Sequence, residues 1–118
     1  MKYRSISVTK EFSFDAAHNL ENYHGKCESL HGHTWKAQVT ITAPLDNDGM
    51  VRDFSEMKNI INKHIKGKLD HSYLNETIKQ PTAENIGLWI YEQLSPNISD
   101  ISEITVYESP TSFSTIKF

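Results

Sequence analysis

The chain has 118 residues and a mass of 13.5 kDa, which suits a single domain spanning residues 1–118. Its 37% hydrophobic residues can form a core, and its net charge of −3 gives no electrostatic reason to expect nucleic acid or an anionic membrane as a partner. With no apolar run long enough for a membrane span and no leader-like start, we expect a soluble, cytoplasmic protein. A single cysteine excludes an internal disulfide, whereas six histidines supply metal ligands.

Two strands are predicted in the first third of the chain. Apolar and polar residues alternate over residues 5–18, and His18 ends the apolar face. The same period continues over residues 31–42, where His31 and His33 begin the apolar face. A polar, irregular segment separates the two stretches, so we expect two strands that each bury one side.

Two helices and two further strands follow. A turn-rich segment, residues 44–49, leads to Asp53, which with Glu56 forms a capping box, and Gly67 is predicted to end this helix. Its apolar stripe consists of Phe54, Met57, Ile61 and Ile65. Thr82 is the expected N-cap of the second helix. Strands are expected at about 102–108 and 113–118. The order β-β-α-α-β-β predicts an α+β domain.

The histidines suggest a metal site. His31 and His33 are two residues apart and therefore project to the same side of a strand, within reach of one tetrahedral zinc ion. Such a pair is also typical of two solvated histidines at a strand end. Pairing of the two strands would bring His18 beside them. Three imidazoles with one open position are the arrangement of catalytic zinc.

Cys27 permits three interpretations. It could close a structural site as a fourth zinc ligand, it could be a buried and inert thiol, or it could be a reactive thiolate that faces the open metal position. Its glycine-rich and charged neighbours, residues 25–28, do not resemble core sequence and favour the thiolate.

Asp70, His71 and Glu108 each have a functional interpretation and a purely structural or solvent-exposed one. Asp70 and His71 could be a carboxylate and the proton-transferring imidazole that it orients, or a loop cap beside a solvated histidine. Glu108 ends a strand, where a carboxylate is usually solvated. If it faces a pocket, it could bind two neighbouring N–H groups of a pterin-like ring.

Five motifs in order carry a specific resemblance: FDAAH at 14–18, CESLHGH at 27–33, LDHSYLN at 69–75, PTAEN at 81–85, and Glu108. Over nearly the whole chain the sequence resembles the 6-pyruvoyltetrahydropterin synthase family, most closely its bacterial branch that feeds queuosine synthesis. The resemblance implies the tunnelling fold, with an antiparallel four-stranded sheet. It also implies a homo-oligomer in which trimers close a barrel and two trimers form a hexamer.

The same resemblance implies the chemistry. The substrate would be 7,8-dihydroneopterin triphosphate, and the products 6-carboxytetrahydropterin, acetaldehyde and triphosphate. The implied roles are zinc binding by His18, His31 and His33, a catalytic thiol at Cys27, proton relay by Asp70 and His71, and pterin anchoring by Glu108.

Glu28 departs from the simplest family pattern. The sequence satisfies both C-x-x-x-H-G-H and E-x-x-H-G-H, and the latter marks a related subgroup that makes 6-hydroxymethyl-7,8-dihydropterin, a folate precursor. Glu28 could therefore contact the substrate as a second base, or be only a charged loop residue. A non-catalytic zinc-binding domain, with Cys27 as the fourth ligand, is a third possibility.

Overall fold

The computed structural model describes residues 2–25 and 28–118, and two long antiparallel strands organise it. These are β1 (Ser7–His18) and β2 (His31–Thr42), as the alternating pattern predicts. Their register pairs His18 with His31 and Ala16 with His33. The side chains of paired residues emerge on the same face of the sheet. The alternate apolar side chains of both strands therefore form one continuous buried surface.

The sheet has five strands in the order β3-β1-β2-β4-β5. β4 (Ile101–Ser109) and β5 (Ser112–Lys117) continue it antiparallel to β2. The expectation of four strands misses β3 (Ser72–Tyr73), which pairs parallel with β1 at Ala16 and Ala17. Two residues are too short to show a periodicity, so the sequence carries no signal for this strand.

The first helix begins as predicted and ends later. α1 (Phe54–Ile61) is capped by Asp53, whose side chain accepts a hydrogen bond from the backbone N–H of Ser55 at 2.8 Å. The expected return contact of the capping box is replaced, because the Glu56 carboxylate lies 2.9 Å from the guanidinium of Arg52. Phe54 is 52% exposed, so it does not belong to the buried stripe.

Gly67 does not end this helix. The chain continues through a π-helical turn, η1 (Asn62–Lys66), into a last helical turn, α2 (Gly67–Leu69). Gly67 has a φ of −62°, an ordinary right-handed value, and Asp70 is the residue that leaves the helix. Glycine composition alone therefore placed the boundary three residues too early.

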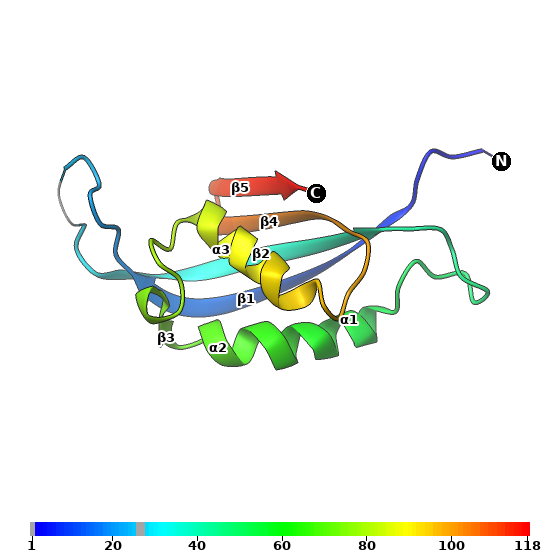
Figure 1. Cartoon of the computed structure of the whole chain (residues 1–118), viewed down its shortest axis with the longest axis horizontal. Coiled ribbons are helices and arrows are strands. Elements are labelled where there is room, and N and C mark those ends of the chain that lie inside the picture. The colour runs from blue at the N-terminus through cyan, green and yellow to red at the C-terminus, as the bar shows by residue number, and fades with distance from the viewer. Residues whose placement is uncertain (1, 26–27) are drawn as a thin grey trace.

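All helices lie on one side of the sheet (Figure 1). α3 (Ala83–Leu94) starts at Thr82, whose side chain accepts from the N–H of Asn85 at 3.1 Å, and a short 3-10 turn, η2 (Leu74–Glu76), precedes it. The core forms between the helices and the inner face of the sheet. The outer face carries polar side chains such as Glu11 and Lys36.

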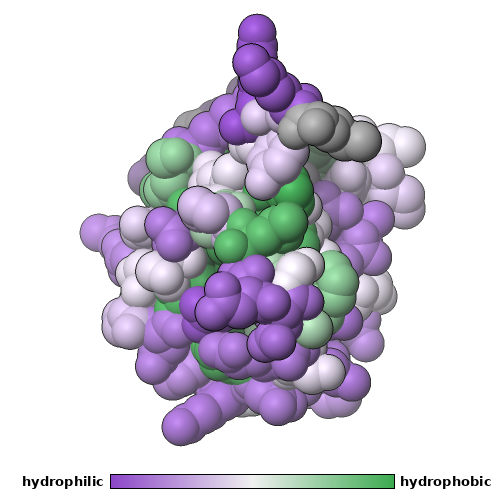
Figure 2. Space-filling model, turned by 90° about the vertical axis from the view of Figure 1, so that its right-hand side faces the viewer, coloured by the Kyte–Doolittle hydropathy of each residue, from purple (hydrophilic) through white to green (hydrophobic). Residues whose placement is uncertain are grey.

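The molecule is elongated, with extents of 54 × 26 × 24 Å. β1 and β2 extend beyond the helices, so the segment between them and the segment after β2 project from opposite ends (Figure 1). The end that follows β2 faces the viewer in Figure 2 and shows an apolar area framed by hydrophilic residues. In the described part of the chain, no helix has the length and apolar character that crossing a membrane requires.

Candidate functional site

Three histidines converge where β1 ends and β2 begins. His18 lies directly opposite His31, and His33 follows two residues later on the same face of β2. The centroids of the three rings are 4.6 to 5.3 Å apart, and one nitrogen of each ring lies within 4.8 Å of the others. Direct strand pairing thus produces the cluster that the sequence predicted.

Backbone carbonyls orient two of the rings. Nδ1 of His18 lies 2.8 Å from the carbonyl oxygen of Pro81, and Nδ1 of His31 lies 2.8 Å from that of Ser29. A carbonyl oxygen only accepts, so each Nδ1 carries the proton and each Nε2 is left with a lone pair. The two Nε2 atoms lie 3.1 Å apart. Tetrahedral zinc with bonds of about 2.0–2.1 Å holds two nitrogens about 3.3 Å apart, which fits this spacing.

His33 offers a third nitrogen suited to a metal. Its Nε2 is buried without a hydrogen-bond partner in the described residues, and the nearest carboxylate oxygen, Oε1 of Glu108, is 3.6 Å away. Burial lowers the pKa of His33, and the neighbouring His31 and His18 lower it further, against the opposing effect of Glu108 and Glu28. A metal binds the neutral imidazole, so these surroundings fit metal binding.

Glu28 and Glu108 approach the triad from two sides. Oε1 of Glu28 lies 3.6 Å from Nε2 of His31 and has no hydrogen-bond partner in the part of the chain that the structure describes. Both carboxylates are too distant for a direct hydrogen bond to the rings. Each carboxylate therefore lies next to one ring of the triad, Glu28 beside His31 and Glu108 beside His33, where a substrate or a metal-bound group would be in reach.

Sequence reasoning missed two supports of the triad. The ring of Trp35 packs edge-on against His18 at 4.9 Å and against His33 at 5.4 Å, and its N–H donates to the carbonyl of Ala16 at 3.2 Å. Strand alternation places Trp35 on the histidine face, so this contact could have been inferred. The carbonyl of Pro81, 63 residues from His18, gave no such signal.

A pocket opens where β2 and β4 separate. Their ladder ends at the pair Lys36 and Tyr107, where the Lys36 ammonium lies 4.2 Å from the centre of the Tyr107 ring. Beyond this pair lies a cavity of about 380 Å³ that both His33 and Glu108 line. Glu108 thus faces a pocket beside the triad, as its functional interpretation requires.

Asp70 and His71 are anchored to β1. Oδ1 of Asp70 accepts from the backbone N–H of Asp15 at 2.9 Å, and the N–H of His71 donates to the carbonyl of Asp15 at 2.6 Å. The hydrogen bond from Asp15 is the main cause that lowers the pKa of Asp70. His71 has a φ of +56°, and its Nε2 lies 3.8 Å from Oδ1 of Asp70.

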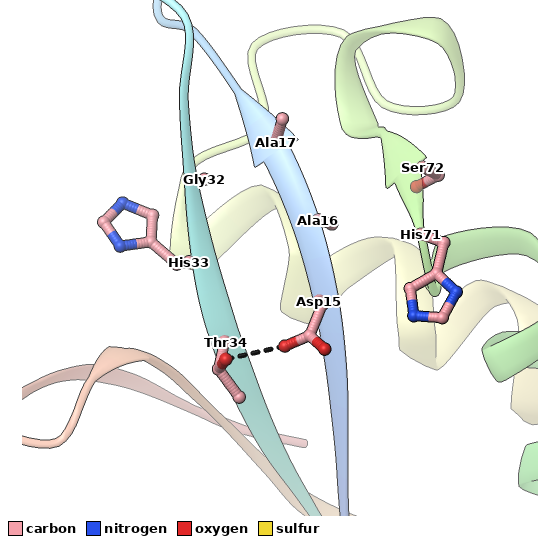
Figure 3. Close-up of a pocket in the computed structure, with 8 residues that line it drawn as sticks. All are labelled: Asp15, Ala16, Ala17, Gly32, His33, Thr34, His71 and Ser72. Carbon is pink, nitrogen blue, oxygen red and sulfur yellow. Dashed lines mark hydrogen bonds between the residues drawn. The ribbon is translucent and has the colours of Figure 1, made fainter.

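The structure does not bring this pair to the triad of its own chain. Asp15, Thr34 and His71 line a pocket of about 530 Å³, which also borders His33 of the triad. In Figure 3 the rings of His33 and His71 lie on opposite sides of the β1–β2 pair. Cys27 lies outside the described residues. One chain therefore presents the predicted site as two separate groups.

Comparison with known proteins gives consistent matches. Residues 7–117 match the sequence family described as 6-pyruvoyl tetrahydropterin synthase. The 6-carboxy-5,6,7,8-tetrahydropterin synthases of Haemophilus influenzae and Synechocystis are 38% and 37% identical, with 92% and 89% of this chain and 96% and 88% of theirs aligned. A dihydroneopterin monophosphate aldolase of Pyrococcus furiosus is 40% identical over 73% of this chain and 72% of its own. The structure of the Caenorhabditis elegans 6-pyruvoyl tetrahydropterin synthase matches the fold with a TM-score of 0.83 at 22% identity, covering 100% of this chain and 99% of that one.

Proposed function

The chain belongs to the 6-pyruvoyl tetrahydropterin synthase family and has its tunnelling fold, and we propose that it makes 6-carboxytetrahydropterin for queuosine synthesis. The proposed substrate is 7,8-dihydroneopterin triphosphate, which together with one water molecule gives acetaldehyde and triphosphate as the other products. The observation that carries this proposal is the triad of His18, His31 and His33, whose free nitrogens converge beside a pocket that Glu108 lines.

The triad is the proposed zinc site. Three features fit zinc: the nitrogen-only donor set, the two anchored Nδ1 atoms, and the Nε2 of His33, which has no hydrogen-bond partner in residues 2–25 and 28–118. When bound, zinc would supply Lewis acidity that acidifies the carbon next to the hydroxyl groups of the substrate side chain.

The chain's own groups would bind the pterin and move protons. Glu108 would accept hydrogen bonds from two neighbouring N–H groups of the pterin ring, which orients the side chain of the substrate toward the triad. The Cys27 thiolate would accept a proton from that side chain. His71, with Asp70 holding it in place, would relay protons to and from the reacting carbons.

The separation of the triad from Asp70 and His71 supports an oligomeric enzyme. We propose that the pair from one copy completes the site on a neighbouring copy, in a homohexamer built from two trimers. The edge strand β5 pairs on only one side. Leu45 and Met50, in the segment after β2, and Phe54, at the start of α1, are 45–52% exposed. Unpaired strand edges and apolar surface are features that assembly covers.

Incubation with dihydroneopterin triphosphate and identification of the product test the proposed activity. The parent protein is expected to form 6-carboxytetrahydropterin, and Cys27→Ala is expected to lose turnover while retaining zinc. Undiminished turnover of Cys27→Ala would disprove the role of the thiol. Loss of zinc from that variant would instead support the structural site in which Cys27 is the fourth ligand.

A second candidate function is synthesis of 6-hydroxymethyl-7,8-dihydropterin. This function is favoured by Oε1 of Glu28, which lies 3.6 Å from Nε2 of His31 and has no hydrogen-bond partner among the described residues. It is also favoured by the relative named dihydroneopterin monophosphate aldolase. If Glu28 acts as a second base, Glu28→Ala should abolish this product and leave 6-carboxytetrahydropterin in place. Glu28→Gln, which keeps the shape and removes the charge, serves as the matched variant.

A further inference from the structure

Asp15 contacts both members of the predicted relay through its backbone. It lies on β1, and its side chain projects from the outer face, opposite to the histidine triad. Its N–H donates to Oδ1 of Asp70 at 2.9 Å, and its carbonyl accepts from the N–H of His71 at 2.6 Å. One residue of β1 therefore sets the position of both groups, and this contact lets His71 keep its left-handed backbone conformation.

The side chain of Asp15 faces the same pocket. Its Oδ1 accepts from the hydroxyl of Thr34 at 2.6 Å, which holds the carboxylate in one orientation. A carboxylate oxygen of Asp15, one of Asp70 and a ring nitrogen of His71 all lie within 4.8 Å of one another. Figure 3 shows the Asp15 carboxylate between Thr34 and the His71 ring. His71 therefore has a carboxylate on the strand side in addition to that of Asp70.

We propose that Asp15 is a positioning residue for the relay, which anchors Asp70 and His71 by its backbone and places a second carboxylate beside the His71 ring. This inference rests on the proposed function for its catalytic consequence, but the contact itself can be tested without turnover. A second negative charge stabilises the imidazolium that forms each time His71 takes up a proton.

The charges around the pocket agree with this role. The Asp15 carboxylate lies within 4.8 Å of both members of the pair. The backbone hydrogen bond from Asp15 lowers the pKa of Asp70 most, and the charges of His71 and Lys66, the latter from η1, lower it further. Two carboxylates beside one imidazole suit a role in proton transfer.

Asp15→Asn isolates the charge, because it keeps the backbone contacts and an oxygen that accepts from Thr34. We expect kcat for dihydroneopterin triphosphate to fall roughly fivefold, from the loss of one charge at this distance in water, with KM changed less than about twofold. Asp15→Glu should restore part of the rate. Glu11→Gln, a carboxylate on the same face of β1 that contacts Gln38 and Lys36, is the matched control and should leave kcat unchanged.

Exchange of the His71 ring Cε1 hydrogen for deuterium, followed by mass spectrometry of the His71 peptide as a function of pH, gives a readout independent of activity. In Asp15→Asn the exchange profile should move toward lower pH, because a negative charge beside the ring is lost, and in Glu11→Gln it should not move. An unchanged His71 profile in Asp15→Asn would overturn the proposal. A shifted profile in a protein that turns over no pterin would uphold the contact and reject the proposed function.

Discussion

At the scale of single residues, the triad shows how backbone groups prepare side chains for a metal. The carbonyls of Pro81 and Ser29 accept hydrogen bonds from Nδ1–H of His18 and His31, so the lone pairs of the two Nε2 atoms face one another 3.1 Å apart. Facing lone pairs repel one another unless a cation lies between them. The three histidines are therefore arranged as a possible metal site, and the folded chain itself already provides this arrangement.

Removal of one ligand should abolish tight metal binding. His31→Ala leaves two nitrogens, and we expect zinc affinity to fall by more than about 100-fold, the upper range for loss of a supporting contact alone. Metal content by mass spectrometry and competition with a chromophoric chelator measure this. The control is His64→Ala, since His64 lies in η1 and contacts only the amide of Asn97, at 3.4 Å, among the described side chains. Full zinc content in His31→Ala would contradict the assigned site.

Asp70 should make stability depend on pH in acid. Its pKa is lowered in the folded protein, chiefly by the N–H of Asp15, so the carboxylate stabilises the fold above its usual pKa and this contribution disappears as the pH falls through the lowered value. Asp70→Asn should unfold more easily in urea at pH 7. The difference from the parent should shrink below about pH 4. Asp48→Asn, in the exposed turn after β2, should show no such pattern.

At the scale of elements, the first helical segment tests what a glycine does. Gly67 has ordinary helical dihedrals, and a Cβ added there would meet no atom within 4 Å. Gly67→Ala should therefore raise the free energy of unfolding by about 0.5–1 kcal/mol, because alanine favours the helix. Gly49, with a φ of +79°, gives the contrast, and Gly49→Ala should lower stability by about 1 kcal/mol. Urea titration measures the free energy of unfolding of both variants. If Gly67→Ala is less stable than the parent, Gly67 does act as a helix C-cap.

Two side-chain amides fasten the segment after β1. Asn75 accepts from the N–H of Asn19 at 3.1 Å and donates to its carbonyl at 2.8 Å, and Gln80 makes the same pair of contacts to Glu21. Each side-chain amide bonds both the N–H and the carbonyl of one residue, as the backbone of a neighbouring strand would. The segment is therefore fixed without a further strand beside it. In the sequence this segment lies between His18 and Glu28, whose carboxylate is 3.6 Å from Nε2 of His31.

Loss of one amide should loosen this segment locally. Asn75→Ala removes two half-buried hydrogen bonds, and we expect a loss of about 1–2 kcal/mol together with faster amide exchange at Asn19 to Glu21. Hydrogen exchange with peptide resolution measures both effects. Glu76→Gln, an exposed neighbour on η2, should leave the exchange unchanged. Equal acceleration throughout the chain would indicate global destabilisation instead of a local clamp.

Local patterns predicted much of the fold and the convergence of the three histidines. Alternation alone placed β1 and β2, and because paired strands bring opposite residues together, it also predicted the convergence of His18 and His31. It could not place His71, since the contacts that hold it join β1 to a residue more than 50 positions away through a two-residue strand. The family motifs supplied its role but not its position on the opposite face.

At the scale of the whole molecule, two incomplete half-sites predict complementation between chains. His31→Ala and His71→Ala should each be inactive alone. When the two variants are unfolded and refolded together in equal amounts, we expect roughly a quarter of the parent activity. Half of the copies carry an intact triad and half carry an intact His71, so about a quarter of the shared sites combine both. Mixing His31→Ala with His33→Ala is the control and should recover nothing, since both damage the triad. Absence of recovery in the first mixture, with mixed assemblies present, would exclude a site shared between copies.

The pairing of His18 with His31 also makes the proposed metal site depend on the register between β1 and β2. A slip of one residue between β1 and β2 would turn His18 to the outer face and expose Phe14, so core burial and ion capture fail together. If the proposed zinc binds this triad, only chains whose β1–β2 pairing is correctly aligned would hold it. Zinc content measured after refolding would then report the alignment of these two strands.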